Sequence, residues 1–186
     1  MLKGIDFIQS EAKIISPNKI ETINKTIETS FILVATGSNS TEIEKFKFNG
    51  NNILSSDDML NLESTPKSLL IIGGGVIGCE FASLFSSLGT SVSLVEKMPQ
   101  LLPNEDNEIA KKLESIFNKR NIQTYTLMDA NEMNLSNFDK ILVCVGRKPN
   151  LKNLGLENAG IKTANGTVVT NEYLATNVKN IFAAGD

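Results

Sequence analysis

The sequence predicts an α/β fold in which a parallel, doubly wound sheet is preceded by a β-rich segment. Three observations support this class. Short apolar runs alternate with helical patterns between residues 67 and 145, which is typical of βαβ units. A glycine-rich turn directly follows the first of these runs and opens the first helical pattern. Before them, residues 1–38 contain short runs rich in Ile, Val and Thr, which favour strands.

Composition divides the chain into four segments. Residues 1–38 are predicted to form strands, with a turn at Ser16-Pro17-Asn18 between the first two. Residues 39–66 are polar and irregular, with one short helical pattern where Ser56 precedes two aspartates, and they predict a connection. Residues 67–150 form the predicted α/β domain, and residues 151–186 form a closing segment.

The α/β segment is predicted element by element from its hydrophobic periodicity. Strands are expected at residues 68–72, 91–95, 122–127 and 140–145. A first helix is expected from 76, with apolar residues at 77, 81, 84, 85 and 88, ending at Gly89. A second helix is expected from a cap at Asn104 to about Lys119. Its expected core face is Ile109, Leu113, Ile116 and Phe117.

Composition also excludes several kinds of chemistry. The chain has 186 residues, which allows one domain, or one domain plus a fragment. Its net charge of −3 argues against nucleic-acid or membrane-surface partners. It has no histidine, so a His-based triad or a His-ligated metal site within it is excluded. Its two cysteines, Cys79 and Cys144, form no close pair, which excludes a zinc knuckle or a local redox disulfide.

The N-terminal residues and the apolar runs bear on where the protein works. The N-terminal residues do not show the basic segment followed by an apolar segment that is typical of a signal peptide. The longest apolar runs are too short to span a bilayer. Together with the sparse cysteines, this predicts a soluble protein in a reducing, cytoplasmic setting.

The glycine-rich turn carries the clearest chemical pattern. G-x-G-x-x-G occupies positions 73, 75 and 78. The first glycine permits a tight turn, the second lets a pyrophosphate approach the backbone, and the third lets the helix pack on the sheet. The N–H groups of the following helix then favour an anion. The residues predicted to bind a cofactor here are Gly73, Gly74, Gly75, Val76, Ile77, Gly78, Cys79 and Glu80.

An acid at the end of the next strand completes the pattern. Glu96 lies where a carboxylate accepts hydrogen bonds from the hydroxyls of an adenosine ribose. It would repel a 2′-phosphate, and neither Arg120 nor Arg147 follows it closely, so NAD is favoured over NADP despite the adjacent Lys97. The alternative to a nucleotide-binding site is that the glycine-rich turn serves only packing and that Glu96 is a solvated acid at the end of a strand.

Five separated segments together resemble the flavin-dependent pyridine nucleotide–disulfide oxidoreductases, and within them the dihydrolipoamide dehydrogenases. They are VATGS at 34–38, GGGVIGCE at 73–80, VEK at 95–97, VGRKPN at 145–150 and IFAAGD at 181–186. The resemblance implies a Rossmann-like NAD-binding domain at 67–150, flanked by β-rich partial pieces of an FAD domain. Residues 1–38 would be a partial FAD-domain β-meander, and residues 151–186 would return into that domain.

The resemblance also implies roles for single residues. Glu80 would lie toward the nicotinamide, with a helix-face acid as the alternative. Gly146 would approach the nicotinamide half, and Arg147 beside it is either a cofactor contact or a solvated basic turn. Thr36 and Gly37 would touch FAD, and Asp186 would reach its ribityl chain. Cys79 and Cys144 are expected to act as small buried hydrophobes.

Departures from the family bear on activity. The parent reaction passes electrons from dihydrolipoamide through a redox disulfide and FAD to NAD⁺. The chain lacks that cysteine pair and the catalytic histidine, so we expect a central, catalytically incompetent portion without bound FAD. Residues 125–139 are also shorter than the antiparallel meander usual in the family.

The expected partners are NAD(H), the FAD and dimerisation domains of a parent chain and, for the parent, 2-oxo acid dehydrogenase complexes. A monomer is expected. The alternatives are an NADH oxidase, a CoA-disulfide, glutathione or mercuric reductase, or a non-catalytic NAD-binding module.

Overall fold

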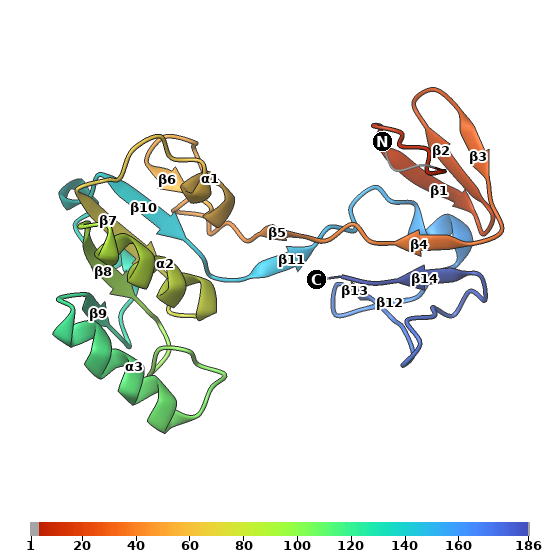
Figure 1. Ribbon diagram of the computed structural model, residues 1–186. Helices are drawn as coiled ribbons and strands as arrows, with labels where there is room; N and C mark the ends of the chain where they lie inside the picture. The colour runs from red at the N-terminus through yellow and green to blue at the C-terminus, as the bar shows by residue number, and fades with distance from the viewer. Residues whose placement is uncertain (1–3, 186) are drawn as a thin grey trace. The chain divides into compact units, whose positions relative to one another are not determined.

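The structure is a computed structural model that describes residues 4–185. The chain forms two compact units, one from residues 40–147 and one from residues 1–39 with 148–186 (Figure 1). The two segments that join the units pair with each other as β5 (Ser38–Ser40) and β11 (Arg147–Pro149). The chain therefore enters and leaves the unit of residues 40–147 through this pair of strands.

The larger unit is built on a five-stranded sheet whose strand order is β6-β10-β7-β8-β9. Every neighbouring pair is parallel, which confirms the predicted fold class. The central strand β7 is buried on both faces, as its continuous apolar sequence predicts. The strands are β6 (Ile53–Leu54), β7 (Ser68–Ile72), β8 (Ser91–Val95), β9 (Gln123–Tyr125) and β10 (Lys140–Val143).

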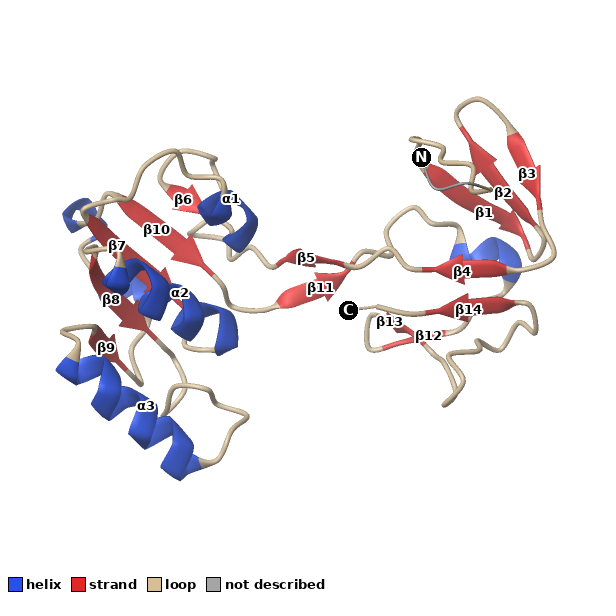
Figure 2. Cartoon of the chain, in the orientation of Figure 1, coloured by secondary structure: helices blue, strands red, loops and turns tan. Residues whose placement is uncertain are grey.

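Different segments cover the two faces of this sheet (Figure 2). Helices α2 (Val76–Ser87) and α3 (Asn107–Lys119) pack on one face, where Phe81, Phe85 and Phe117 meet Leu69 and Ile71 of β7. The other face is covered by segments without long helices, where Phe46 and Ala130 meet Leu70 and Ile72. The alternation of side chains along β7 thus supplies both cores.

The second long helix differs from its prediction. It begins at Asn107 because Asp106, not Asn104, caps it by accepting a hydrogen bond from the N–H of Glu108. Its predicted core face is also partly wrong, since Ile109 and Ile116 are 58% and 41% exposed. Phe117 is buried as predicted and Leu113 packs partly buried against the core, while Ala110 is buried in place of the two isoleucines. Residues on two adjoining sides of this helix are apolar, and only packing decides which side is buried.

The segment predicted to be a connection adds an edge strand to the sheet. β6 pairs with β10, and helix α1 (Ser56–Leu60) follows it. The cap is Ser55, whose hydroxyl accepts a hydrogen bond from the N–H of Asp58 while the Asp58 carboxylate accepts from the N–H of Ser55. The cap therefore lies one residue before the predicted one, Ser56.

The connection between β9 and β10 contains no strand in the part of the chain that the structure describes. It holds two short 3-10 helices instead, η1 (Ala130–Glu132) and η2 (Leu135–Asn137). Each is capped by an Asx side chain, Asp129 and Asn134 respectively. Polar caps and a few apolar contacts therefore order this short segment.

The smaller unit consists of short sheets around one apolar cluster. β1 (Ala12–Ser16), β2 (Lys19–Thr22) and β3 (Thr26–Glu28) are antiparallel, and β4 (Ile32–Val34) pairs in parallel with β14 (Ile181–Ala183). A small hairpin, β12 (Thr163–Ala164) with β13 (Thr167–Val168), and the helix η3 (Leu156–Ala159) complete it. Its core is Ile14, Ile32, Val34, Leu156, Ala159, Ile161 and Ile181.

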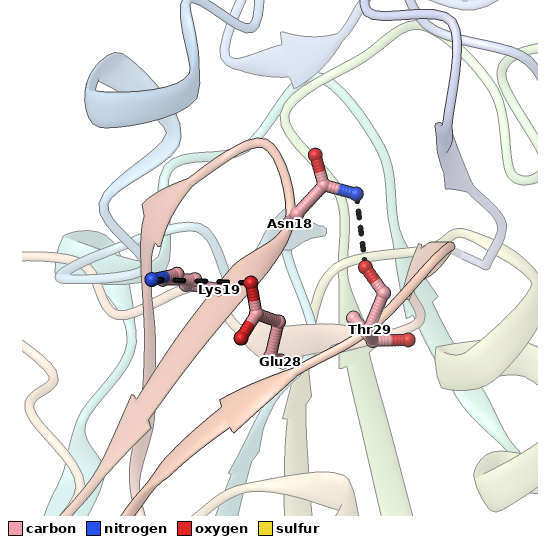
Figure 3. Close-up of polar contacts among 4 residues, drawn as sticks. All are labelled: Asn18, Lys19, Glu28 and Thr29. Atoms are coloured by element: carbon pink, nitrogen blue, oxygen red, sulfur yellow. Dashed lines mark hydrogen bonds and ion pairs between the residues drawn. The ribbon is translucent and has the colours of Figure 1, made fainter.

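Side-chain polar contacts link parts of the antiparallel sheet and its turns (Figure 3). The Asn18 side-chain amide donates a 2.9 Å hydrogen bond to the Thr29 carbonyl, which joins the β1–β2 turn to the chain after β3. Lys19 and Glu28 face each other across β2 and β3 with a separation of 3.9 Å between Nζ and Oε1. The predicted turn at Pro17 is confirmed.

Candidate nucleotide-binding site

The glycine-rich turn is held by steric contacts that only glycine permits. Gly73 has φ +113°, and a Cβ on it would lie 2.5 Å from the Cys144 carbonyl oxygen. A Cβ on Gly78 would overlap the carbonyl oxygen of Gly73. The predicted roles of these two residues, a tight turn and close helix-to-strand packing, are thus visible in the backbone.

Gly75 differs from these two because open space surrounds its missing side chain. It is the N-cap of α2 with φ −72°, and no side chain caps the helix there. A Cβ on Gly75 would have no atom within 4 Å. The first helical bond runs from the N–H of Cys79 to its carbonyl, so the preceding N–H groups of the first turn lie at an uncapped helix end that suits an anion.

A cavity of about 730 Å³ opens at this helix end, entirely within residues 40–147. Its volume lies in the range typical of small-molecule sites, about 300–1,000 Å³. It lies where ligands bind in open parallel sheets, at the carboxyl ends of the strands. Residues that line it include Phe46, Gly73, Gly75, Val76, Ile77, Glu96, Lys97, Met98, Met128, Asp129, Cys144 and Gly146.

Glu96 lies on the cavity wall with only 8% of its surface exposed. Its Oε2 accepts a 2.6 Å hydrogen bond from the N–H of Gly74, and its Oε1 accepts one of 2.7 Å from the N–H of Met98. The alternative of a solvated strand-end acid is therefore wrong. Each carboxylate oxygen still has a second lone pair, so a hydroxyl contact is compatible with this arrangement.

The two thiols lie beneath the glycine turn. Cys79 Sγ contacts the Gly74 carbonyl at 3.4 Å, and Cys144 Sγ contacts the Gly73 carbonyl at the same distance. The pKa of Cys79 is raised to about 11 and that of Cys144 to about 12, mainly by burial, and the Glu96 carboxylate contributes to both shifts. Both thiols are therefore protonated at neutral pH; Cys79 is buried as predicted, whereas Cys144 is only partly buried.

Other predicted site residues take different positions. Gly146 lines the cavity with φ +126°, whereas Gly74, Cys79 and Glu80 are not among its lining residues. Glu80 is exposed on α2, beyond the first turn. Arg147 is exposed in β11, where its guanidinium donates to Ser40 Oγ at 3.2 Å. The cofactor roles of these residues stay predictions.

The residues predicted to touch FAD lie in the smaller unit. Thr36 and Gly37 line a hollow of about 170 Å³ together with Gly185. That volume is below the range typical of cofactor sites. Asp186, predicted to reach the ribityl chain, lies outside the described residues.

Two cavity-lining segments were missed by sequence reasoning. One is residues 43–46, in the predicted connection, and the other is residues 128–131, after β9. Neither has a periodic apolar pattern. Their common property is a position beyond the sheet's carboxyl edge, a place where loops in parallel sheets contact ligands. That rule would have indicated residues 128–131 once β9 was recognised as a parallel strand.

Known proteins resemble this chain along its whole length. Residues 1–186 match the family described as pyridine nucleotide-disulphide oxidoreductase. The chain belongs to this family. A dihydrolipoyl dehydrogenase of Bacillus subtilis is 35% identical over 83% of the chain, and a mercuric reductase of Staphylococcus aureus is 33% identical over 98%. A solved structure of the HOCl-induced flavoprotein disulfide reductase RclA of Escherichia coli, as a Cu(II) complex, matches with a TM-score of 0.88 and 28% identity.

The extent of these matches is unequal. The chain spans 37% of the length of each of the two relatives named above. The match to RclA covers 100% of this chain and 46% of the RclA chain. Among residues 4–185 there is no group of three or more His, Cys, Asp or Glu side chains placed to hold a metal, and no helix long and apolar enough to cross a membrane.

Proposed function

We propose that this chain is the NAD(H)-binding portion of a dihydrolipoamide dehydrogenase-like flavoenzyme. The cavity at the N-terminus of α2 is the main support for this proposal. No side chain caps the helix there, and open space surrounds the position of the missing Gly75 side chain. A dinucleotide pyrophosphate fits these groups chemically, since backbone N–H groups and the helix dipole both favour phosphate. When bound, the nicotinamide supplies hydride transfer.

NAD is the preferred nucleotide in this proposal. The buried Glu96 carboxylate lies on the cavity wall at the end of β8. Accepting from a ribose hydroxyl suits it, whereas a 2′-phosphate would meet its negative charge. No arginine lines the cavity, so the bidentate partner that phosphate prefers is missing from its described wall.

The parent reaction is proposed to be oxidation of dihydrolipoamide. Dihydrolipoyl dehydrogenases from several organisms are 33–36% identical to this chain. A mercuric reductase at 33% identity makes another disulfide reductase of the family the second candidate. A non-catalytic NAD-binding module is the third, and it would share the same cavity.

The chain by itself is proposed not to perform the dithiol chemistry. A dithiol–disulfide centre needs a reactive thiolate, and the only two cysteines have pKa values raised to about 11 and 12. Dihydrolipoamide and NAD⁺ added to the 186-residue protein should therefore give no NADH absorbance above the uncatalysed rate. Turnover would contradict this part of the proposal.

Calorimetric titration of NADH into the wild-type chain and Gly75→Asp tests the cavity. Aspartate is a favoured N-cap residue, and its side chain would enter space that holds no protein atom within 4 Å of the Cβ. We expect an unchanged or higher melting temperature but at least about tenfold weaker NADH binding, because the carboxylate repels phosphate at the helix end. Ser115→Val, on an exposed position of α3 outside this cavity, is the control. Wild-type protein that binds no NADH at millimolar concentration would overturn the proposal.

A further inference from the structure

The short segment after β9 is fastened to the end of the strand that carries Glu96. The N–H of Met128 donates a 3.2 Å hydrogen bond to the Glu96 carbonyl, and the N–H of Leu127 donates one of 3.1 Å to the Met98 carbonyl. These bonds lie just beyond the last paired residues of β8 and β9. They bring residue 129 to the wall of the cavity beside Glu96.

Asp129 is held in place as the cap of η1. Its carboxylate accepts a 2.9 Å hydrogen bond from the N–H of Asn131 and a second from that residue's side-chain amide. Its own N–H donates to the Glu132 carboxylate at 3.3 Å. This reciprocal capping box fixes the direction of a half-buried side chain.

The charges around this end of the cavity have mixed signs. The hydrogen bond from the Asn131 N–H is the main cause that lowers the Asp129 pKa, and the charges of Lys97 and Lys45 lower it further. Asp129 is thus ionised, and it lines the same cavity as the Lys45 and Lys97 ammonium groups, which otherwise suit phosphate. The charged residues on the cavity wall are Glu44, Lys45, Glu96, Lys97 and Asp129.

We propose that Asp129 is a second specificity residue for the nucleotide, which excludes a 2′-phosphate by neutralising Lys45 and Lys97 at the adenosine end of the cavity. This inference rests on the proposed function, since it concerns the same cavity. A phosphate monoester carries nearly two negative charges at neutral pH, so one nearby carboxylate affects it far more than a hydroxyl. The short connection between β9 and β10 supplies this carboxylate.

A purely structural role as the η1 cap is the competing explanation. Substitution of Asp129 by asparagine distinguishes the capping role from the specificity role. Asparagine caps helices about as well as aspartate and keeps an oxygen that can accept a hydrogen bond from Asn131. Asp129→Asn should therefore keep the fold while removing the charge. Asp57→Asn makes the same change at an exposed residue of α1 outside the cavity, and is the matched control.

The test is titration of NADH and of NADPH into the wild-type chain, both single variants and the Asp129→Asn/Lys97→Met double variant. We expect Asp129→Asn to strengthen NADPH binding about fivefold, with NADH changed less than about twofold, and the gain to shrink at high salt. The double variant should lose the gain, and Asp57→Asn should show none.

The outcomes separate this inference from the proposed function. Suppose that wild-type protein binds NADH but Asp129→Asn leaves NADPH binding unchanged or strengthens the binding of both nucleotides equally. The role of Asp129 is then overturned, while the proposed function stands. Tight NADPH binding by wild-type protein also overturns it. If neither nucleotide binds to wild-type protein or to Asp129→Asn, the inference and the proposed function both fail.

Discussion

The N–H of Gly74 donates a 2.6 Å hydrogen bond to the carboxylate of Glu96. The bond joins the glycine turn after β7 to the end of β8, and the two residues also pack closely, since a Cβ on Gly74 would lie 2.9 Å from that of Glu96. The same carboxylate accepts from the N–H of Met98. Glu96 therefore holds the backbone of the cavity wall in place through these hydrogen bonds, in addition to placing a carboxylate on that wall.

Glu96→Gln should lower both stability and nucleotide affinity. A glutamine has one acceptor oxygen, so one of the N–H groups of Gly74 and Met98 would face an amide donor. Leaving a buried donor unpaired costs about 1–3 kcal/mol. Urea unfolding measures this loss, and NADH titration measures the affinity. Glu63→Gln, at an exposed position, should change neither, and an unaltered Glu96→Gln protein would contradict the structural role.

Gly78→Ala should destabilise the protein far more than Gly75→Ala. The first adds a methyl group against the Gly73 carbonyl oxygen, whereas the second adds it to open space. Overpacking of this kind costs about 1–3 kcal/mol, while a Gly-to-Ala change at an N-cap costs about 1 kcal/mol or less. Thermal unfolding of the two variants gives the comparison. Equal melting temperatures would show that the backbone contact relaxes without cost.

The thiols of Cys79 and Cys144 should resist alkylation in the folded protein. Their pKa values rise from 9.0 to about 11 and about 12, which lowers the thiolate fraction near pH 8 by about a hundredfold or more. Mass spectrometry after iodoacetamide treatment, with and without urea, measures the difference. Rapid labelling of folded protein would contradict it.

The same shifts predict how stability changes with pH. The folded pKa of each thiol is raised, so its contribution is fully present below the unfolded value of 9.0 and is lost as pH rises toward 11 and 12. Denaturation midpoints should therefore fall above about pH 9. Cys144→Ala should reduce this fall. An identical alkaline decline in the variant would assign the effect to other groups.

Glu28→Gln should have almost no effect on stability. Its ion pair with Lys19 has a separation of 3.9 Å, and the two side chains are 77% and 47% exposed (Figure 3). Exposed pairs of this kind contribute about 0–1 kcal/mol. Chemical denaturation at low and high salt measures the change. A loss well above that range would mean that the pair orders the β2–β3 sheet.

The purified 186-residue chain should be colourless. The hollow lined by Thr36 and Gly37 is about 170 Å³, smaller than the cavities that usually hold cofactors. An absorbance spectrum of the protein, with a released-flavin assay after denaturation, checks this. Stoichiometric flavin would contradict the expectation.

Local sequence predicted the central βαβ elements well. Continuous apolar residues in β7 and β8 and the glycine turn specify their own structure, because strand burial, turn geometry and helix initiation depend on near neighbours. Glu96 could be recognised for the same reason, by its fixed distance from the turn. The edge strand β6 could not, since two apolar residues make no recognisable pattern.

The sequence by itself determined the fold class, the glycine-rich turn and the acid at the end of β8, because all three follow from residue order over short spans. Only the tertiary structure decided which side of α3 is buried, why Glu96 is shielded from solvent, and that Asp129 shares a cavity wall with Lys45. These facts depend on segments distant in sequence that meet at one edge of the sheet, where packing and long-range hydrogen bonds, and not local periodicity, set the geometry.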